Sequence, residues 1–188
     1  MKAVLIAAIA MAASLSIAVS AEELALKKTK MPSAVIAAVS EAYDISRGNY
    51  DTGGISKVVV YKNAKNLSYY GIVRNLLGSY QLDTSENACV DVKLDACARL
   101  ILAHSEDVKA NFQPSAFTDF VAEMKGWTIE EDGFDEKVST IEGYVLSMLG
   151  ADYKTFALGY DDIADVFDLI LISKDRKTVV VVSGDYGA

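Results

Sequence analysis

The sequence predicts a single α+β domain in which helices pack on a mostly antiparallel sheet, as in an αβα sandwich, with a β-hairpin at the C-terminus. Three observations support this fold class. Apolar residues recur at helical spacing in several separate segments. The β-rich segments gather near the C-terminus instead of alternating with helices. The last two of these segments are joined by four residues, which is a hairpin length.

The first elements follow from local patterns. A helix begins near Pro32, where apolar residues start to recur at helical spacing, and it ends at Gly48. Residues 49–54 are rich in turn formers and predict a loop. The β-branched residues of 56–63 predict a short strand, and residues 68–78 predict a brief helix that ends at its own glycine.

The central segment, residues 79–111, has no clear period. Val90, Val92 and Leu94 alternate with polar residues, as they would in a strand. Residues 97–112 fit a strand or a helix equally well, and both alternatives stay open.

The second half of the chain has clearer helical and strand patterns. A helix is expected from Pro114, with its phenylalanines on one face, and a longer helix carries an apolar stripe from Val138 to Leu149 before Gly150 ends it. Three strands are then expected at 153–159, 164–173 and 178–184.

The N-terminus predicts export. Lys2 precedes an almost wholly small or apolar run, residues 3–19, and Val19 and Ala21 are small residues at the −3 and −1 positions of a cleavage site. The run is shorter than the roughly 20 residues that a membrane span needs. We therefore expect residues 1–21 to be a signal peptide and 22–188 to form the domain, which would be periplasmic or secreted with no membrane span.

The charge balance limits the classes of partner. The chain has 26 acidic and 18 basic residues and a net charge of −8. Nucleic acids and anionic membranes are themselves polyanions, so neither is the expected partner, whereas a basic protein is compatible with an acidic surface.

Cys89 and Cys97 are separated by seven residues. In an oxidising compartment an isolated pair of this kind is usually a disulfide. The spacing is not that of a Cys-x-x-Cys redox motif. We expect a structural disulfide that contributes roughly 2–3 kcal/mol.

The catalytic signals are weak. His104 is the only histidine, and the Ser105 beside it does not create triad geometry through sequence adjacency alone. The glycine-rich motifs for nucleotides and the nucleophile elbow are missing. If Gly133 is placed at the sixth position of a calcium loop, the two end ligands become Thr128 and Ser139, which do not fit. We expect a protein that is not an enzyme and has neither a metal nor a cofactor; an enzyme would need His104 to face a pocket with a second titratable group.

Four aspartates surround the start of the strand expected at 164–173: Asp161, Asp162, Asp165 and Asp168. Strand alternation points Asp165 and Asp168 to opposite faces, which argues against a shared metal site. The main expectation is a charged, solvated strand entry that also deters edge pairing. A surface that meets a partner is the alternative.

The order of elements resembles the nuclease A inhibitor-like family. The matching features are Phe117 and Phe120, Trp127 followed by Glu130 and Glu131, the long helix, Leu158-Gly159, and Asp165-Val166-Phe167. The chain departs from the family pattern in a longer 79–111 segment, in Gly126 where the family has Asp, in an acidic loop reduced to Asp51, and in its C-terminal residues.

The resemblance implies a protein that blocks the active site of a non-specific, metal-dependent nuclease or another basic protein. The contact residues expected on this basis are Asp51, Trp127, Glu130, Glu131, Asp161 and Asp162. The alternative function is a non-enzymatic periplasmic or envelope-associated module that binds a different ligand or protein.

Overall fold

The computed structural model describes residues 25–48, 54–79, 93–107, 117–127, 133–158 and 166–185. The elements in these residues are β1 (Leu26–Lys28), α1 (Ser33–Gly48), β2 (Gly54–Asn63), α2 (Tyr69–Gly78), α3 (Leu94–Asp107), α4 (Phe117–Trp127), α5 (Phe134–Leu149), β3 (Tyr153–Leu158), β4 (Val166–Ser173) and β5 (Thr178–Asp185).

The five strands form one sheet in the order β1-β2-β5-β4-β3, and every neighbouring pair is antiparallel. β4 and β5 are joined by the short turn at residues 174–177, so the predicted C-terminal hairpin is confirmed. The predicted α+β class is confirmed as well.

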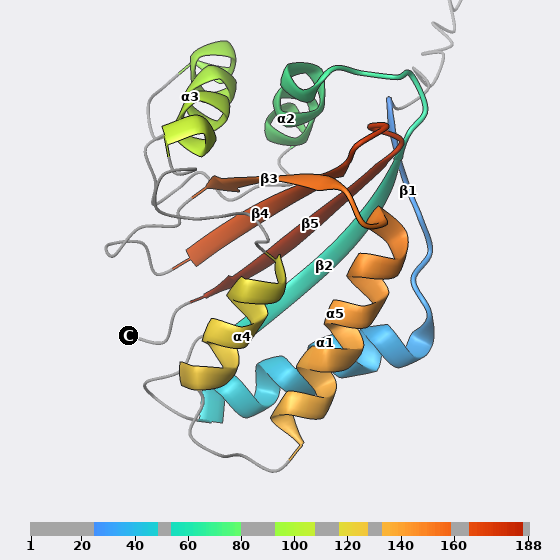
Figure 1. Cartoon of the computed structure of the whole chain (residues 1–188), viewed down its shortest axis with the longest axis vertical. Helices are drawn as coiled ribbons and strands as arrows, with labels where there is room; N and C mark the ends of the chain where they lie inside the picture. The colour runs from blue at the N-terminus through green and yellow to red at the C-terminus, as the bar shows by residue number, and fades with distance from the viewer. Residues whose placement is uncertain are drawn as a thin grey trace, which may run out of the picture.

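Helices cover both faces of the sheet (Figure 1). On one face, buried residues of α1, α4 and α5 share a core with Phe167, Leu169 and Leu171 of β4. On the other face, α2 and α3 pack over Ile170 and Ile172 of the same strand. The result is the predicted αβα sandwich, in which alternate residues of one strand enter two separate cores.

The middle strand β5 explains why the sheet is stable between two helical layers. Val179, Val180, Val181 and Val182 all have 0% exposed surface. β-branched side chains suit a pleated surface that is packed on both sides. An antiparallel strand buried on both faces loses the alternation of apolar and polar residues that marks a half-buried one.

The sheet has two ends that differ in what they carry. Gly54, Asp185 and Val166 are paired in register, and Leu158 pairs with Asp168 nearby, so the start of β2, the end of β5, the start of β4 and the end of β3 meet at one end. We call this the far end. The opposite end contains the turn 174–177 and is called the hairpin end.

A close backbone approach occurs at the far end, where Ile55 pairs with Gly184 next to an irregularity in the β2–β5 register. A Cβ atom added to Gly184 would lie within 3.0 Å of both the Gly54 carbonyl oxygen and the Phe167 ring. Only glycine allows the two strands and the ring to come this close.

Two expectations of local structure need correction. Leu94, expected in a strand, is the first residue of helix α3; Val90 and Val92 lie outside the described residues. The three-residue strand β1 was not expected at all. Among the described residues, no helix is both long and apolar enough to cross a membrane.

Candidate functional site

Most of the predicted contact residues lie outside the described residues: Asp51, Glu130, Glu131, Asp161 and Asp162. Trp127 is the last residue of α4, and its side chain also lies outside what the structure describes. The elements that flank these residues are described, and they show where the acid-bearing segments leave the fold.

Two of the three acid-bearing segments leave from the far end of the sheet. Residues 49–53, with Asp51, lead into Gly54 at the start of β2. Residues 159–165, with Asp161 and Asp162, run from the end of β3 to the start of β4. Because the strand pairing holds these strand ends together, the sheet tethers both segments to one end of the molecule.

The third acidic segment joins two antiparallel helices. Lys125, near the end of α4, donates a hydrogen bond of 2.8 Å to Ser139 Oγ in the second turn of α5. Glu130 and Glu131 therefore fall between the end of α4 and the start of α5. The first turn of α5 carries Asp135 and Glu136, whose negative charge suits the positive end of the helix dipole.

Asp168 is not part of a solvated rim, so this expectation is wrong. Its exposed fraction is only 4%, and β4 is an interior strand between β5 and β3 with no free edge to protect. The Ser183 hydroxyl of β5 donates a hydrogen bond to the Asp168 carboxylate. A buried carboxylate needs such a donor to offset the loss of water, and Asp168 is a structural residue of the sheet.

Asp161, Asp162 and Asp165 lie outside the described residues, so their role as a strand entry remains a prediction. The predicted alternation of β4 is confirmed by its neighbours, because Phe167 and Leu169 enter the core opposite to Ile170. In the described part of the chain, no group of three His, Cys, Asp or Glu side chains could hold a metal ion.

The central helix α3 carries Cys97 and His104. Cys97 is 2% exposed and packs in the core beneath α2 and α3, and no cysteine of the described residues is free. Its predicted partner Cys89, and the side chain of His104, lie outside what is described. The Cys89–Cys97 disulfide and the role of His104 therefore stay predictions.

The disulfide prediction can be tested by thiol alkylation and mass spectrometry. We expect protein made in an oxidising compartment to take up no alkylating label when it is denatured without reductant, and two labels after reduction. Two labels without reductant would show that the pair is not bonded.

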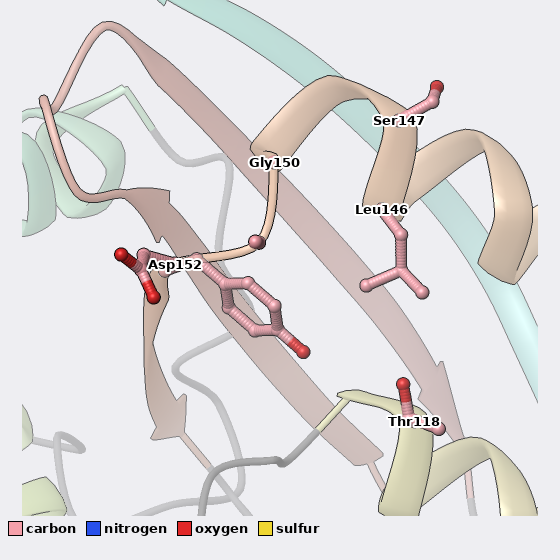
Figure 2. Close-up of a pocket in the computed structure, with 7 residues that line it drawn as sticks. Thr118, Leu146, Ser147, Gly150 and Asp152 are labelled. Atoms are coloured by element: carbon pink, nitrogen blue, oxygen red, sulfur yellow. The ribbon is translucent and has the colours of Figure 1, made fainter.

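A hollow of about 810 Å³ lies between the start of α4 and the end of α5. Figure 2 shows Leu146 and Thr118 on its two sides, with Asp152 pointing away from both.

The polar groups of the hollow already make hydrogen bonds within the fold: Tyr153 OH accepts a hydrogen bond of 3.3 Å from the Phe117 N–H, and Ser147 Oγ donates one of 2.6 Å to the Tyr144 carbonyl. Burial raises the pKa of Tyr153, which keeps this phenol neutral. The hollow therefore lacks a converging set of groups that would define a ligand.

Basic side chains gather at the hairpin end, which sequence analysis did not anticipate. They come from β1, β2, the turns and β3: Lys27, Lys62, Lys65, Lys154, Lys174, Arg176 and Lys177. The described acids beside the turn are Asp152 and Asp175, and each pairs with a lysine of the turn, at 2.8 Å to Lys174 and 3.5 Å to Lys177. The hairpin end therefore keeps an excess of positive charge among the described residues.

Two tyrosines at the start of α2 organise part of this charge. Lys154 Nζ lies 5.0 Å and Arg176 Cζ lies 6.0 Å from the centre of the Tyr69 ring, and Arg99 Cζ lies 5.3 Å from the centre of the Tyr70 ring. These distances are those of cation–π contacts. We call these five residues the cation–tyrosine patch.

A neutral pair borders the patch. Arg74 Nε donates a hydrogen bond of 2.5 Å to Asp95 Oδ1, and Tyr70 OH donates one of 3.0 Å to the same oxygen. The Arg74 guanidinium, and after it the Tyr70 hydroxyl, hold the pKa of Asp95 below its usual value. Asp95 is therefore ionised and pairs with Arg74; it also attracts Arg99, so Lys154 and Arg176 are the cations of the patch that it does not engage.

No family model, curated protein or solved structure matches this chain.

Proposed function

We propose that this protein is an exported, non-enzymatic binding protein that blocks a basic partner with the acidic segments at the far end of its sheet, in the manner of a nuclease inhibitor. The observation that supports the proposal is the strand pairing at that end, because the strand ends next to the segments containing Asp51, Asp161 and Asp162 lie at the same end of the sheet.

The distribution of charge supports an interaction through these segments. Ten of the 26 acidic residues lie in the segments 49–53, 80–92, 128–132 and 159–165 between the elements, whereas only one of the 18 basic residues, Lys109, lies in a segment of this kind. Binding sites are often carried by connecting segments that a rigid scaffold positions. A sheet held between two helical layers supplies such a scaffold here.

Charge complementarity gives the proposed partner its chemistry. A nuclease that acts on any sequence must bind phosphates, so its active site carries basic side chains and a divalent metal. A cluster of carboxylates tethered to one end of a small domain can enter such a groove, and opposite charge raises the association rate and selects the partner. If the Trp127 side chain is exposed at the end of α4, it would add an aromatic anchor of the type that dominates interface energies.

The proposal is tested by titrating the purified protein into a panel of secreted, metal-dependent, non-specific nucleases and following DNA cleavage in excess metal. We expect stoichiometric loss of cleavage with at least one nuclease. The variant with Asp51→Asn, Asp161→Asn and Asp162→Asn should raise the inhibition constant at least about tenfold, because close charge pairs at such interfaces contribute about 1.5 kcal/mol or more each.

The matched control removes charge at the opposite end of the sheet. Asp152→Asn with Asp175→Asn changes exposed carboxylates at the hairpin end. This control should inhibit as well as the wild type does. Equal weakening by both variants would indicate a response to net charge alone, and an absence of inhibition across the panel would reject the nuclease as partner.

A further inference from the structure

We propose that the cation–tyrosine patch is a docking surface for an anionic membrane, where it contacts the phosphate head groups of lipids. This goes beyond the proposed function, because it concerns the hairpin end of the sheet and a different class of partner. It is also independent of that function, since it requires no nuclease.

The first support is that Lys154 and Arg176 share the ring of Tyr69. Neither cation makes an ion pair with any described residue, although both are held beside the same aromatic side chain. The nearby Asp175 is engaged by Lys177 and by the Ser173 hydroxyl. Both cations therefore lie within 6.0 Å of one ring centre, and an anion at this surface would be attracted by both.

The second support is the backbone of Arg176. Its φ is +59°, in the left-handed region that favours glycine or asparagine. The carbonyl of Arg176 accepts a hydrogen bond of 2.9 Å from Asn63 Nδ2, which helps to fix this conformation. Glycine would fit this conformation without strain, but the arginine places a guanidinium beside the Tyr69 ring. Residues with strained backbones of this kind are often found at functional sites.

The third support is the distance between the two charged ends. β5 runs from the hairpin end to the far end over 8 residues, which corresponds to roughly 25 Å at the usual rise of a strand. The Debye length at physiological ionic strength is about 8 Å. The strand ends that flank the acidic segments 49–53 and 159–165 therefore lie about three Debye lengths from the hairpin end. The net charge of −8, which argued against an anionic membrane, does not describe the hairpin end, where the described residues include seven basic and two acidic side chains.

The surroundings of the Tyr69 and Tyr70 rings favour a membrane over single-stranded nucleic acid as the binding partner. Bases bind such surfaces by stacking on open aromatic faces. Here Tyr69 lies beside two cations and packs against Phe156 at 5.7 Å between ring centres, and Tyr70 has Arg99 over its ring. Half-buried tyrosines with cations around them suit the head-group region of a membrane, where amphipathic rings and basic side chains both gather.

The orientation that results is compatible with the proposed function. Helices α2 and α3 lie together on one face of the sheet (Figure 1). The patch is formed by residues of these helices, of β3 and of the turn 174–177. A molecule docked there would hold its far end away from the lipid surface. The acidic segments would then remain accessible to a protein partner.

The test is co-sedimentation of the purified protein with vesicles of equal parts phosphatidylglycerol and phosphatidylcholine, compared with vesicles of phosphatidylcholine alone. We expect binding to the anionic vesicles only, and loss of that binding as salt is raised. The double variant Lys154→Gln, Arg176→Gln should lower the partition coefficient roughly 25-fold, because each basic residue near an anionic surface contributes about fivefold.

The matched control is Lys125→Gln with Lys137→Gln, which removes the same charge from α4 and α5 on the other side of the sheet. The control should bind as the wild type does, and circular dichroism should show the same helix content in all forms. Equal binding to both kinds of vesicle, or equal loss in both double variants, would overturn the proposal. Binding to a single-stranded oligonucleotide but not to anionic vesicles would overturn it in favour of a nucleic-acid surface.

Discussion

Gly184→Ala is expected to lower the free energy of unfolding by about 3 kcal/mol, the upper end of the range for overpacking a core. The added methyl group would meet the Gly54 carbonyl oxygen and the Phe167 ring at less than 3.0 Å. A flexible side chain could move aside, but a backbone carbonyl within a paired strand cannot move without disturbing the β2–β5 register. Urea denaturation followed by circular dichroism would measure the loss.

Gly143→Ala is the control for this substitution. Gly143 lies in the middle of α5, is exposed, and has no heavy atom within 4 Å of an added Cβ. Alanine should raise the free energy of unfolding by about 0.5–1 kcal/mol, because glycine in a helix interior is unfavourable by that amount. If Gly184→Ala and Gly143→Ala change the free energy of unfolding in the same direction, the result would contradict the close backbone approach at Gly184.

Phe167→Ala is expected to lower the free energy of unfolding by about 3–5 kcal/mol, the usual cost of truncating a buried aromatic residue. Phe167 is 2% exposed and meets Phe120 of α4 edge to face, with the ring centres 5.0 Å apart. It therefore joins the sheet to the helical layer, and its loss opens a cavity that neither element can fill without moving. Thermal and urea denaturation would both report the change.

Ile36→Ala provides the comparison. Ile36 is a large apolar residue that is 52% exposed on α1, so its removal leaves no cavity. The stability should change by no more than about 0.5 kcal/mol, since surface substitutions away from packed sites have small effects. A loss at Ile36 equal to that at Phe167 would contradict the assignment of the core.

Much of the fold could be predicted from local patterns. The helix ending at Gly48, the strand ending at Asn63 and the C-terminal hairpin all have clear apolar periods or stop signals. The four buried valines of β5 were recognisable as a strand because β-branched residues favour strands even when no alternation is visible.

The errors arose where tertiary contacts outweigh the local signal. β1 is only three residues long, and Leu26 is fixed there by pairing with Asn63 and by burial in the core beneath α2. Leu94 continued an alternating pattern, yet it begins α3 and packs against that same core. Neither the pairing of Leu26 with Asn63 nor the packing of Leu94 against the core can be identified from the neighbouring sequence.

Local sequence also fails to predict features of the candidate sites that depend on tertiary contacts. Asp168 follows a run of exposed-looking aspartates, and only the pairing of β4 with β5 reveals that Ser183 lies opposite and that the carboxylate is buried. The cation–tyrosine patch brings together Tyr69, Lys154 and Arg176 from distant parts of the chain. Its sequence signal is spread over separate elements, so no motif could have shown it.

The position of β5 also has a kinetic consequence. β5 is the last strand along the described chain, yet it lies between β2 and β4 in the middle of the sheet. The hydrogen bond from Ser56 Oγ to the Ser183 carbonyl joins residues 127 positions apart. Until this last strand is made, β2 and β4 each expose an unpaired edge, and the closure of so long a loop makes folding slow. For a protein that is exported unfolded, as we propose for this one, such late closure would leave time for transport before the sheet forms.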